Sequence, residues 1–462
     1  MTPPPARAAW FATLLLALLG GCAGPRPAIP PQAAVVAPPA WRTPLGPGAP
    51  IDEAWWGRFG DPALSALVER AISNNSDILA AAARVQEARA QTRLARSQLF
   101  PTLDGGASLS RSQSPSPLGG SSRTTTVQPA FQAAYEVDLF GRIRNDVAAA
   151  RSNLLATQAA ADAIRLSVAS ATASSYITLR ALDARLAVVE ATLASRAEAL
   201  RIARDRAEVG YTSQLELRQA EAEYRSASQL VPQARLQIAR QENALSLLTG
   251  DPPRAPSRGA ALAALRQPAI PAGLPSDVLR RRPDIAEAEN LLAAADASLS
   301  STRAEFLPRV QLTGSLGLLL SSAIDPVTLW SVGGSVLAPI LNGGRIRAQA
   351  DIAAARRDQA AFAYRDTVLT AFREVEDNLA GVRDLAAQRE EVEAQRVALA
   401  EALRHATNRY EAGYSSYLEQ LDAQRALLNA ELALIQVRAD ELNAYVGLYQ
   451  ALGGGWPGLP EI

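Results

Sequence analysis

The chain has 462 residues, with 46 basic and 46 acidic side chains and therefore no net charge. Every basic residue is an arginine, and the chain contains one histidine and one cysteine. The absence of a basic block argues against nucleic-acid binding. A single cysteine excludes an intrachain disulfide framework and a thiolate metal site.

The N-terminus has the pattern of a signal peptide. The apolar run at residues 8–19 is too short for a membrane span, and Leu19-Gly-Gly-Cys22 follows it. A cysteine at this cleavage point resembles a bacterial lipobox, so we expect residues 1–21 to be removed and Cys22 to carry a lipid. The alternative is a secreted protein with a chance cysteine. Residues 23–50 are rich in Pro, Ala and Gly, and we expect a lipid-anchored tether at 22–60.

The rest of the chain repeats itself. Arg206–Tyr211 recurs as Arg409–Tyr414, and Gly141–Arg144 recurs as Gly344–Arg347, each displaced by 203 residues. Repeat units of this length indicate a tandem duplication rather than a solenoid of short units.

We therefore expect a first half at 61–250 and a second half at 276–462. A Pro-rich linker at 251–275 joins them. Each half is expected to begin with a helix, and a C-terminal tail follows the second.

Two pairs of alternating segments predict β-hairpins at 101–140 and 308–341. In the first, Phe131 and Tyr135 face one way and Gln132 the other, which is the period of a strand with one apolar face. Pro129 is tolerable only near a strand end or a bulge.

Long helical hairpins are predicted at 141–250 and 343–452. Arg142 to about Glu208 contains neither Pro nor Gly, and at ~1.5 Å per residue this helix would be about 100 Å long. Gly210 and Gly413 supply the left-handed backbone that reverses such a helix. Pro232 is expected to kink the returning helix of the first half.

Four strands with an apolar face cannot cross a membrane as an open sheet, because unpaired backbone groups cost several kcal/mol each in lipid. Four strands are also too few for a spanning barrel. Closure therefore requires several copies, and three copies would supply about twelve strands.

The sequence resembles the TolC-like outer-membrane factors, in particular the NodT-type efflux lipoproteins. The motifs that carry this resemblance are Trp55-Trp56, Phe59–Pro62, 274–285, the paired Gly-Arg-Ile-Arg sequences and Tyr417–Arg425. It implies a mixed α+β membrane protein that forms a homotrimer. In such a trimer a 12-stranded β-barrel in the outer membrane continues as a periplasmic α-helical barrel.

The resemblance also implies a function: the outer-membrane channel of a tripartite efflux pump, a passive exit duct for small molecules. Its partners would be a periplasmic adaptor (membrane fusion) protein, an inner-membrane transporter of the resistance–nodulation–division (RND) type and outer-membrane lipid. A type I protein-secretion channel and a metal-efflux channel remain alternatives. A lipid-anchored periplasmic coiled-coil adaptor or scaffold is an alternative of another class.

No catalytic constellation, cofactor site or metal site is visible, so the chain is not expected to be an enzyme. The only histidine, His405, lies in a helical pattern among Arg and Ala and is interpreted as structural.

The resemblance places a periplasmic gate after the second Gly-Tyr turn. Leu418 would form an apolar constriction, and Asp422 a ring of like charges one turn away on the same helix face. The alternative is that Asp422 is an ordinary surface charge paired with an arginine, for which Arg425 is a candidate. In the first half Leu215 matches Leu418, but Gln219 replaces Asp422, so each chain is expected to contribute one Asp.

The resemblance also suggests roles for the hairpin tips. Glu216 and Tyr414 occupy positions similar to a hydrogen-bonded pair that latches the closed state. The tip residues expected to contact the adaptor are Val209, Gly210, Tyr211, Gly413 and Tyr414.

Overall fold

The computed structural model describes residues 25–43, 52–115, 119–270 and 275–459. Cys22 and the predicted signal peptide lie outside the described residues. The chain divides into two compact units. Unit 1 contains 84–158 and 287–366 with the segment before residue 36, and unit 2 contains the remainder.

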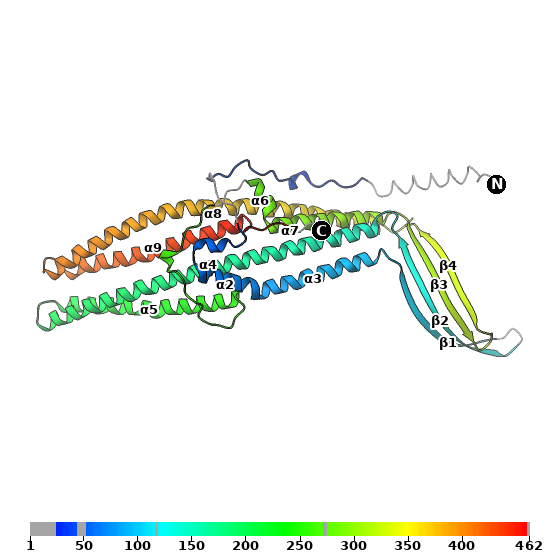
Figure 1. Cartoon of the computed structure of the whole chain (residues 1–462), viewed down its shortest axis with the longest axis horizontal. Helices are drawn as coiled ribbons and strands as arrows, with labels where there is room; N and C mark the ends of the chain where they lie inside the picture. Colours follow the sequence, from blue (N-terminus) through cyan, green and yellow to red (C-terminus); the bar gives the residue numbers. More distant parts are fainter. Residues whose placement is uncertain (1–24, 44–51, 116–118, 271–274, 460–462) are drawn as a thin grey trace. The chain divides into compact units, whose positions relative to one another are not determined.

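Unit 1 contains one antiparallel sheet, in which the strands follow the order β1-β2-β3-β4 (Figure 1). The strands are β1 Thr102–Pro115, β2 Ser121–Val137, β3 Arg309–Ser321 and β4 Val327–Leu337. Each half of the duplication contributes one hairpin, and β2 pairs with β3 to join them.

The register places the apolar side chains in rows across the sheet. Phe131 on β2 is opposite Gly105 on β1 and Leu316 on β3, and Leu316 is opposite Trp330 on β4. The neighbouring row on the other face is polar. It consists of Asp104, Gln132, Ser315 and Ser331. One face of the sheet is thus apolar and the other polar, as the alternation of the sequence predicts.

Pro129 lies in the middle of β2 rather than near its end. The ladder between β2 and β3 pairs Val127 with Leu320 and resumes only at Ala130 with Gly317. A proline has no amide N–H to donate, so the ladder is interrupted there. A Cβ at Gly317 would lie 2.7 Å from the Pro129 carbonyl oxygen, which explains the glycine.

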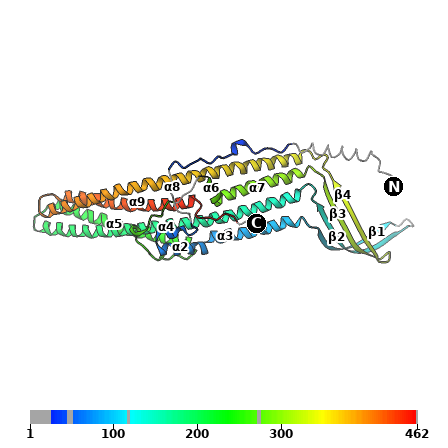
Figure 2. The ribbon, with the colours of Figure 1, turned by 45° about the horizontal axis from the view of Figure 1, so that its top comes forward.

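Parts of four helices complete unit 1 (Figure 2). They belong to α3 Ser76–Ser97, α4 Arg142–Glu208, α7 Pro283–Ala304 and α8 Arg345–Glu411. Within this unit Thr92 Oγ1 donates to the Ala150 carbonyl at 3.2 Å, which ties α3 to α4.

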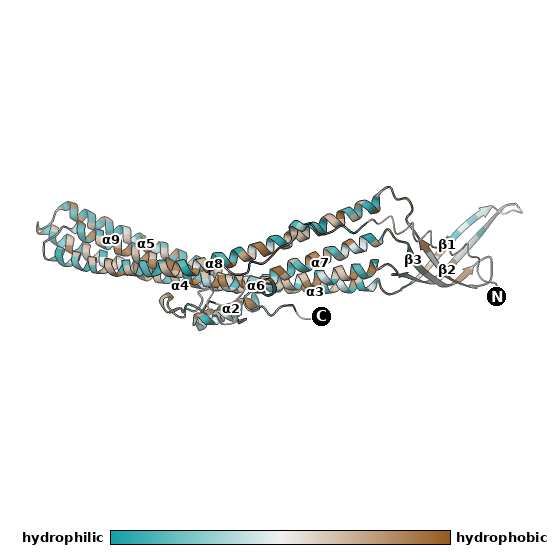
Figure 3. Cartoon of the chain, turned by 90° about the horizontal axis from the view of Figure 1, so that it is seen from above, coloured by the Kyte–Doolittle hydropathy of each residue, from teal (hydrophilic) through white to brown (hydrophobic). Residues whose placement is uncertain are grey.

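Unit 2 contains the rest of α4 and α8 and the helices that return beside them. Its other elements are η2 Trp55–Phe59, α2 Pro62–Asn74, α5 Gln214–Leu248, η3 Leu262–Ala264, α6 Pro275–Arg281 and α9 Tyr417–Ala451. Pro232 lies inside α5, which continues through it as one helix. Polar and apolar residues alternate along these hairpins (Figure 3). No helix in the described part of the chain is both long and apolar enough to cross a membrane.

The segment expected as a tether ends in a structured turn. Trp55 and Phe59, both in η2, are fully buried. The Trp55 ring stacks on Tyr449 of α9 with centroids 5.4 Å apart. Burial of large aromatic surface is strongly favourable, so these residues belong to the core of unit 2.

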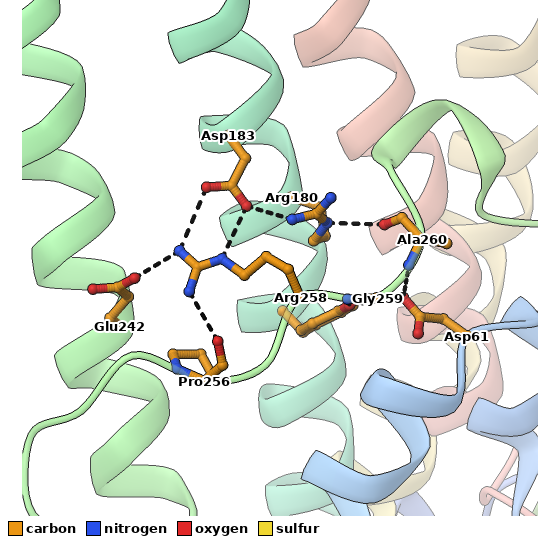
Figure 4. Close-up of polar contacts among 9 residues, drawn as sticks. Asp61, Arg180, Asp183, Glu242, Pro256, Arg258, Gly259 and Ala260 are labelled. Carbon is orange, nitrogen blue, oxygen red and sulfur yellow. Dashed lines mark hydrogen bonds and ion pairs between the residues drawn. The ribbon is translucent and has the colours of Figure 1, made fainter.

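The linker between the halves is held against α4 by buried polar contacts (Figure 4). Asp61 caps α2 through the Ala63 amide at 2.8 Å. The same carboxylate accepts from the Ala260 amide at 2.9 Å and from the Tyr176 hydroxyl at 2.7 Å. Burial and the hydrogen bond to Asp61 raise the pKa of Tyr176 to about 12.

Arg258 of the linker braces the first hairpin. Its guanidinium lies 3.2 Å from Asp183 on α4 and 2.6 Å from Glu242 on α5. Arg180 on α4 donates to the Ala260 carbonyl at 2.9 Å. One arginine in the linker therefore joins both helices of the hairpin.

The following linker residues contact the second hairpin. Gln267 Nε2 donates to the buried Glu441 of α9 at 2.9 Å, and Arg389 of α8 pairs with the same carboxylate at 2.9 Å. The Tyr449 hydroxyl donates to the Ala269 carbonyl at 3.0 Å. The linker thus bonds both hairpins of unit 2.

Candidate functional site at the tips of the helical hairpins

Both hairpins turn in the same way. Gly210 has φ 78° and Gly413 has φ 79°, values at which a side chain would be strained. The amide of Tyr211 donates back to the Arg206 carbonyl at 2.8 Å, and the amide of Tyr414 does the same to the Arg409 carbonyl. This Schellman-type arrangement ends α4 and α8 and lets the chain reverse.

The side chains around these turns project into solvent. Tyr414 is 82% exposed, and Tyr211 and Val209 are exposed as well. Exposed tyrosines together with aliphatic residues at a turn form a surface suited to a protein partner.

The two predicted gate residues lie on one exposed face of α9. Leu418 is 57% exposed, and Asp422 follows one turn later on the same face. The opposite face buries Tyr417 and Leu421. Among the described residues, Asp422 has no side-chain ion-pair partner within 4 Å, but the hydrogen bond to Glu223 and, less strongly, the charge of Asp422 raise the pKa of Arg425.

The buried face of α9 packs against the first hairpin. Tyr417 and Leu421 join Tyr410 of α8, Ala203 of α4 and Ala220 of α5 in one apolar cluster. The rings of Tyr410 and Tyr417 lie 5.7 Å apart. This cluster, the tip cluster, connects the two hairpins just behind the predicted gate residues.

Glu216 joins the hairpins on the polar side of the tip cluster. It accepts from the Tyr410 hydroxyl and from Thr212 Oγ1, both at 2.5 Å. Burial and the hydrogen bond to Glu216 raise the pKa of Tyr410 to about 12. The structure does not bring Glu216 together with Tyr414 within the chain, so that pairing stays a prediction.

A second polar junction lies next to Asp422 in sequence. Arg425 of α9 pairs with Glu223 of α5, and Arg196 of α4 lies 3.7 Å from the same carboxylate. Arg196 is 3% exposed and also donates to Gln424 of α9. Within the chain Arg425 therefore has Glu223 as its ion-pair partner, and besides the hydrogen bond to Glu223 the negative charge of Asp422 also raises the pKa of Arg425. Both interpretations of Asp422, gate charge and surface charge, stay predictions.

Sequence reasoning missed these junction residues, although the duplication carries a signal for them. At the displacement of 203 residues, Tyr410 corresponds to Ala207, Arg425 to Ala222 and Glu223 to Ala426. These three contact residues lie where the halves differ, whereas Glu216 corresponds to Glu419 and is shared by both halves. A comparison of the halves would therefore have marked Tyr410, Glu223 and Arg425 but not Glu216.

The tip presents exposed tyrosine, leucine and aspartate side chains. No group of three His, Cys, Asp or Glu side chains that could hold a metal ion occurs among the described residues. His405 is exposed, with Nε2 3.2 Å from Arg404.

Comparison with known proteins identifies the family. The family described as "Outer membrane efflux protein" matches residues 67–251 and 274–454. The chain belongs to this family. The matched ranges cover one segment in each half of the duplication. Membership confirms the expected class, an efflux channel component of the outer membrane and not an enzyme, and decides against a periplasmic scaffold.

Relatives and solved structures agree over most of the chain. The solvent efflux pump outer membrane protein SrpC of Pseudomonas putida is 38% identical over 411 residues, 86% of each chain. OprJ of Pseudomonas aeruginosa is 36% identical over 434 residues, 88% of each chain.

Among solved structures, the CmeC outer membrane channel of Campylobacter jejuni superposes with a TM-score of 0.86, with 27% identity and 94% of both chains covered. The open-state MtrE channel of Neisseria gonorrhoeae gives a TM-score of 0.82 with 30% identity, covering 93% of this chain and 98% of that one. The TolC-like fold expected from the sequence is thereby confirmed.

Proposed function

We propose that three copies of this chain form a passive exit duct in the outer membrane, as the channel of a tripartite pump. The observation that carries this proposal is the sheet: four antiparallel strands with an apolar and a polar face, and with β1 and β4 at its edges. In lipid every backbone group must be paired, so β4 of one copy would pair with β1 of the next. Three copies close twelve strands.

The polar face would line the lumen and the apolar face would contact lipid. Trp330 is 74% exposed and Val332 83% exposed on β4, an arrangement that suits acyl chains and not water. Ser315 and Ser331 bond each other at 2.8 Å on the opposite face, consistent with a wetted interior.

The hairpin tips would form the periplasmic end of the duct. Exposed Tyr211 and Tyr414 support a contact with a periplasmic adaptor, and the exposed Leu418 and Asp422 support a gate. The inner-membrane transporter, of the RND type, would supply the energy. Relatives that are named solvent, toluene and antibiotic efflux components support small molecules as cargo.

A lipid on Cys22 would anchor each copy to the same membrane. Cys22→Ser should abolish labelling by a radioactive fatty acid. Equal labelling of the variant would rule out lipidation at this residue.

The decisive experiment on the channel is assembly in detergent and in planar bilayers. Extracted protein should give the mass of a trimer and open single channels. A stable monomer without conductance would contradict the proposal. Trp330→Asp on the lipid face should lower the yield of inserted protein, whereas Ser331→Asp on the polar face should leave it unchanged, because only the first places a charge in lipid.

A further inference from the structure

An extended N-terminal segment lies against α7 and α8 of unit 1, and arginines hold it by its backbone. Arg357 donates to the carbonyls of Pro27 and Ala28 at 2.5 and 2.9 Å. Arg365 donates to the carbonyls of Gln32 and Ala34 at 2.7 and 3.2 Å. We call residues 25–34 the strap; Figure 2 shows this segment beside α8.

The strap is also fixed at its N-terminal end. Arg303 donates to the Pro25 carbonyl at 3.3 Å. Arg26 forms an ion pair with Asp296 of α7 at 2.5 Å. The contacts advance along α8 from residue 365 to residue 357 and reach the last turn of α7, so the strap has one direction and one register.

Arg357 is the strongest sign that the strap is a built contact. Its side chain is 1% exposed, and a buried guanidinium is stable only when its donors are satisfied. Its partners are the strap carbonyls and Asp358, 2.5 Å away. Proline-rich backbone offers carbonyls without N–H groups, which is the chemistry that an arginine recognises.

The duplication supplies an internal comparison. Arg357 corresponds to Leu154 and Arg365 to Asp162 in the first half. The chain has one N-terminal segment and two helices that could receive it, and only the second helix carries these arginines. Arg357 and Arg365 therefore occur only in the half that contacts the strap, and the fold that both halves share does not require them.

The contact between Arg303 and Pro25 places the start of the strap at the end of α7. Arg303 lies in the last turn of α7, and β3 starts at Arg309. Residue 22 is three residues from Pro25, hence at most about 10 Å away.

We propose that the strap is a docked element, that Arg303, Arg357 and Arg365 are its positioning residues, and that it holds the lipid-bearing N-terminus at the sheet end of α7 and α8. The part that concerns the lipid rests on the proposed lipidation of Cys22. The docking itself does not depend on it.

The first experiment measures docking with a thiol at a buried strap position. Ala33 is 6% exposed, so Ala33→Cys in the full chain with Cys22→Ser should react slowly with a maleimide. Adding Arg357→Leu and Arg365→Leu should raise the rate at least about tenfold, since hydrogen bonds from charged donors are the strong ones. Arg356→Gln is the matched control, because Arg356 is exposed on the same helix and should leave the rate unchanged.

If the arginine variants label no faster than the parent, docking is refuted. Elastase cleavage near residue 33 of the chain with native strap sequence provides a second readout, which does not require the new thiol. Elastase cleavage should likewise be faster only in the variants that replace Arg357 and Arg365.

The second experiment tests the link to the lipid by measuring the fraction of chain assembled in the outer membrane. Arg357→Leu with Arg365→Leu should lower this fraction when Cys22 is present and have no further effect with Cys22→Ser. The proposal that the strap positions the lipid is refuted if the arginine variants lower the assembled fraction equally with Cys22 and with Cys22→Ser. It is also refuted if they lower it in neither. If the Cys22→Ser variant and the parent are lipidated equally, Cys22 is not the lipidation site. The result on strap docking then still stands.

Discussion

At the scale of single residues, the tip depends on a few polar groups that connect helices of different hairpins. Glu216 on α5 accepts a hydrogen bond from the Tyr410 hydroxyl of α8, and Glu223 on α5 forms an ion pair with Arg425 of α9. Each acidic residue belongs to the first hairpin and each partner to the second. A movement of one hairpin away from the other must break these bonds, which makes them the residues to test first.

Removing the Tyr410 hydroxyl should weaken the contact between the hairpins. Tyr410→Phe keeps the ring in the tip cluster but removes one of the two hydrogen bonds to Glu216, a loss of about 1.5–3 kcal/mol for a bond to a charged group. We expect higher basal conductance in planar bilayers. Tyr211→Phe is the control, because that side chain is 86% exposed. Equal conductance of the two variants would show that the bond does not hold the tip closed.

Two of the tyrosines whose pKa is raised, Tyr176 and Tyr410, predict sensitivity to alkali. Tyr176 and Tyr410 have a pKa of about 12 in the folded chain, against about 10 for an unfolded tyrosine. Between pH 10 and 12 the unfolded chain releases these protons and the folded chain retains them, so stability falls as pH rises.

The measurement is the unfolding temperature in detergent from pH 9 to 12. The double variant Tyr176→Phe/Tyr410→Phe should start lower at pH 9 and decline less steeply from pH 10 to 12. Parallel curves for parent and variant would contradict the assignment.

At the scale of elements, sequence patterns predicted the periodic parts well. Arg142–Glu208 forms one helix because no Pro or Gly interrupts it, and Gly210 ends it because the reversal requires positive φ. The strand faces followed from alternation. These features depend on local preference and burial, which a single sequence contains.

Contacts between distant segments could not be predicted in the same way. The burial of Trp55 depends on Tyr449, almost 400 residues away, and the linker contacts depend on Arg258 reaching two helices. Within the candidate site, the exposed positions of Leu418 and Asp422 agree with the motif, whereas the partner of Glu216 depends on how two hairpins pack. Helical period alone does not distinguish Tyr410 from Tyr414 as that partner.

The linker provides a prediction at this scale. A Cβ at Gly259 would lie 2.0 Å from Asp61 Oδ1, so Gly259→Ala must displace the linker or the α2 cap. Overpacking of this kind costs about 1–3 kcal/mol. We expect a lower unfolding temperature and faster tryptic cleavage after Arg254 or Arg258. Gly57→Ala, whose Cβ would meet nothing within 4 Å, should change neither. If Gly259→Ala has the unfolding temperature and the cleavage rate of the parent, the linker is not held by Asp61.

At the scale of the whole molecule, the duplication gives two similar hairpins that differ at the predicted gate. Both have a Gly-Tyr turn and a leucine that follows it, Leu215 and Leu418, and both leucines are exposed. Only the second half adds the carboxylate, since Gln219 stands where Asp422 would be. At this position the halves therefore differ in charge, which predicts that the second hairpin determines ion selectivity.

The gate can be tested by bilayer conductance. Three copies of Asp422 near a common axis would form a ring of negative charge, and such rings favour cations. Asp422→Ala should abolish the cation preference and any block by multivalent cations. Leu418→Ala should widen the opening and increase leak of large antibiotics while the cation preference remains.

Gln219→Ala is the matched control, because it alters the corresponding position of the first hairpin without changing charge. It should leave both conductance and the cation-to-anion permeability ratio at the parental values. Arg425, whose pKa is raised by its hydrogen bond to Glu223 and by the charge of Asp422, keeps its ion pair with Glu223 when Asp422 is replaced. A change in selectivity can then be attributed to the ring itself. If Asp422→Ala and Gln219→Ala give the same selectivity as the parent, the charge that selects ions lies elsewhere in the duct.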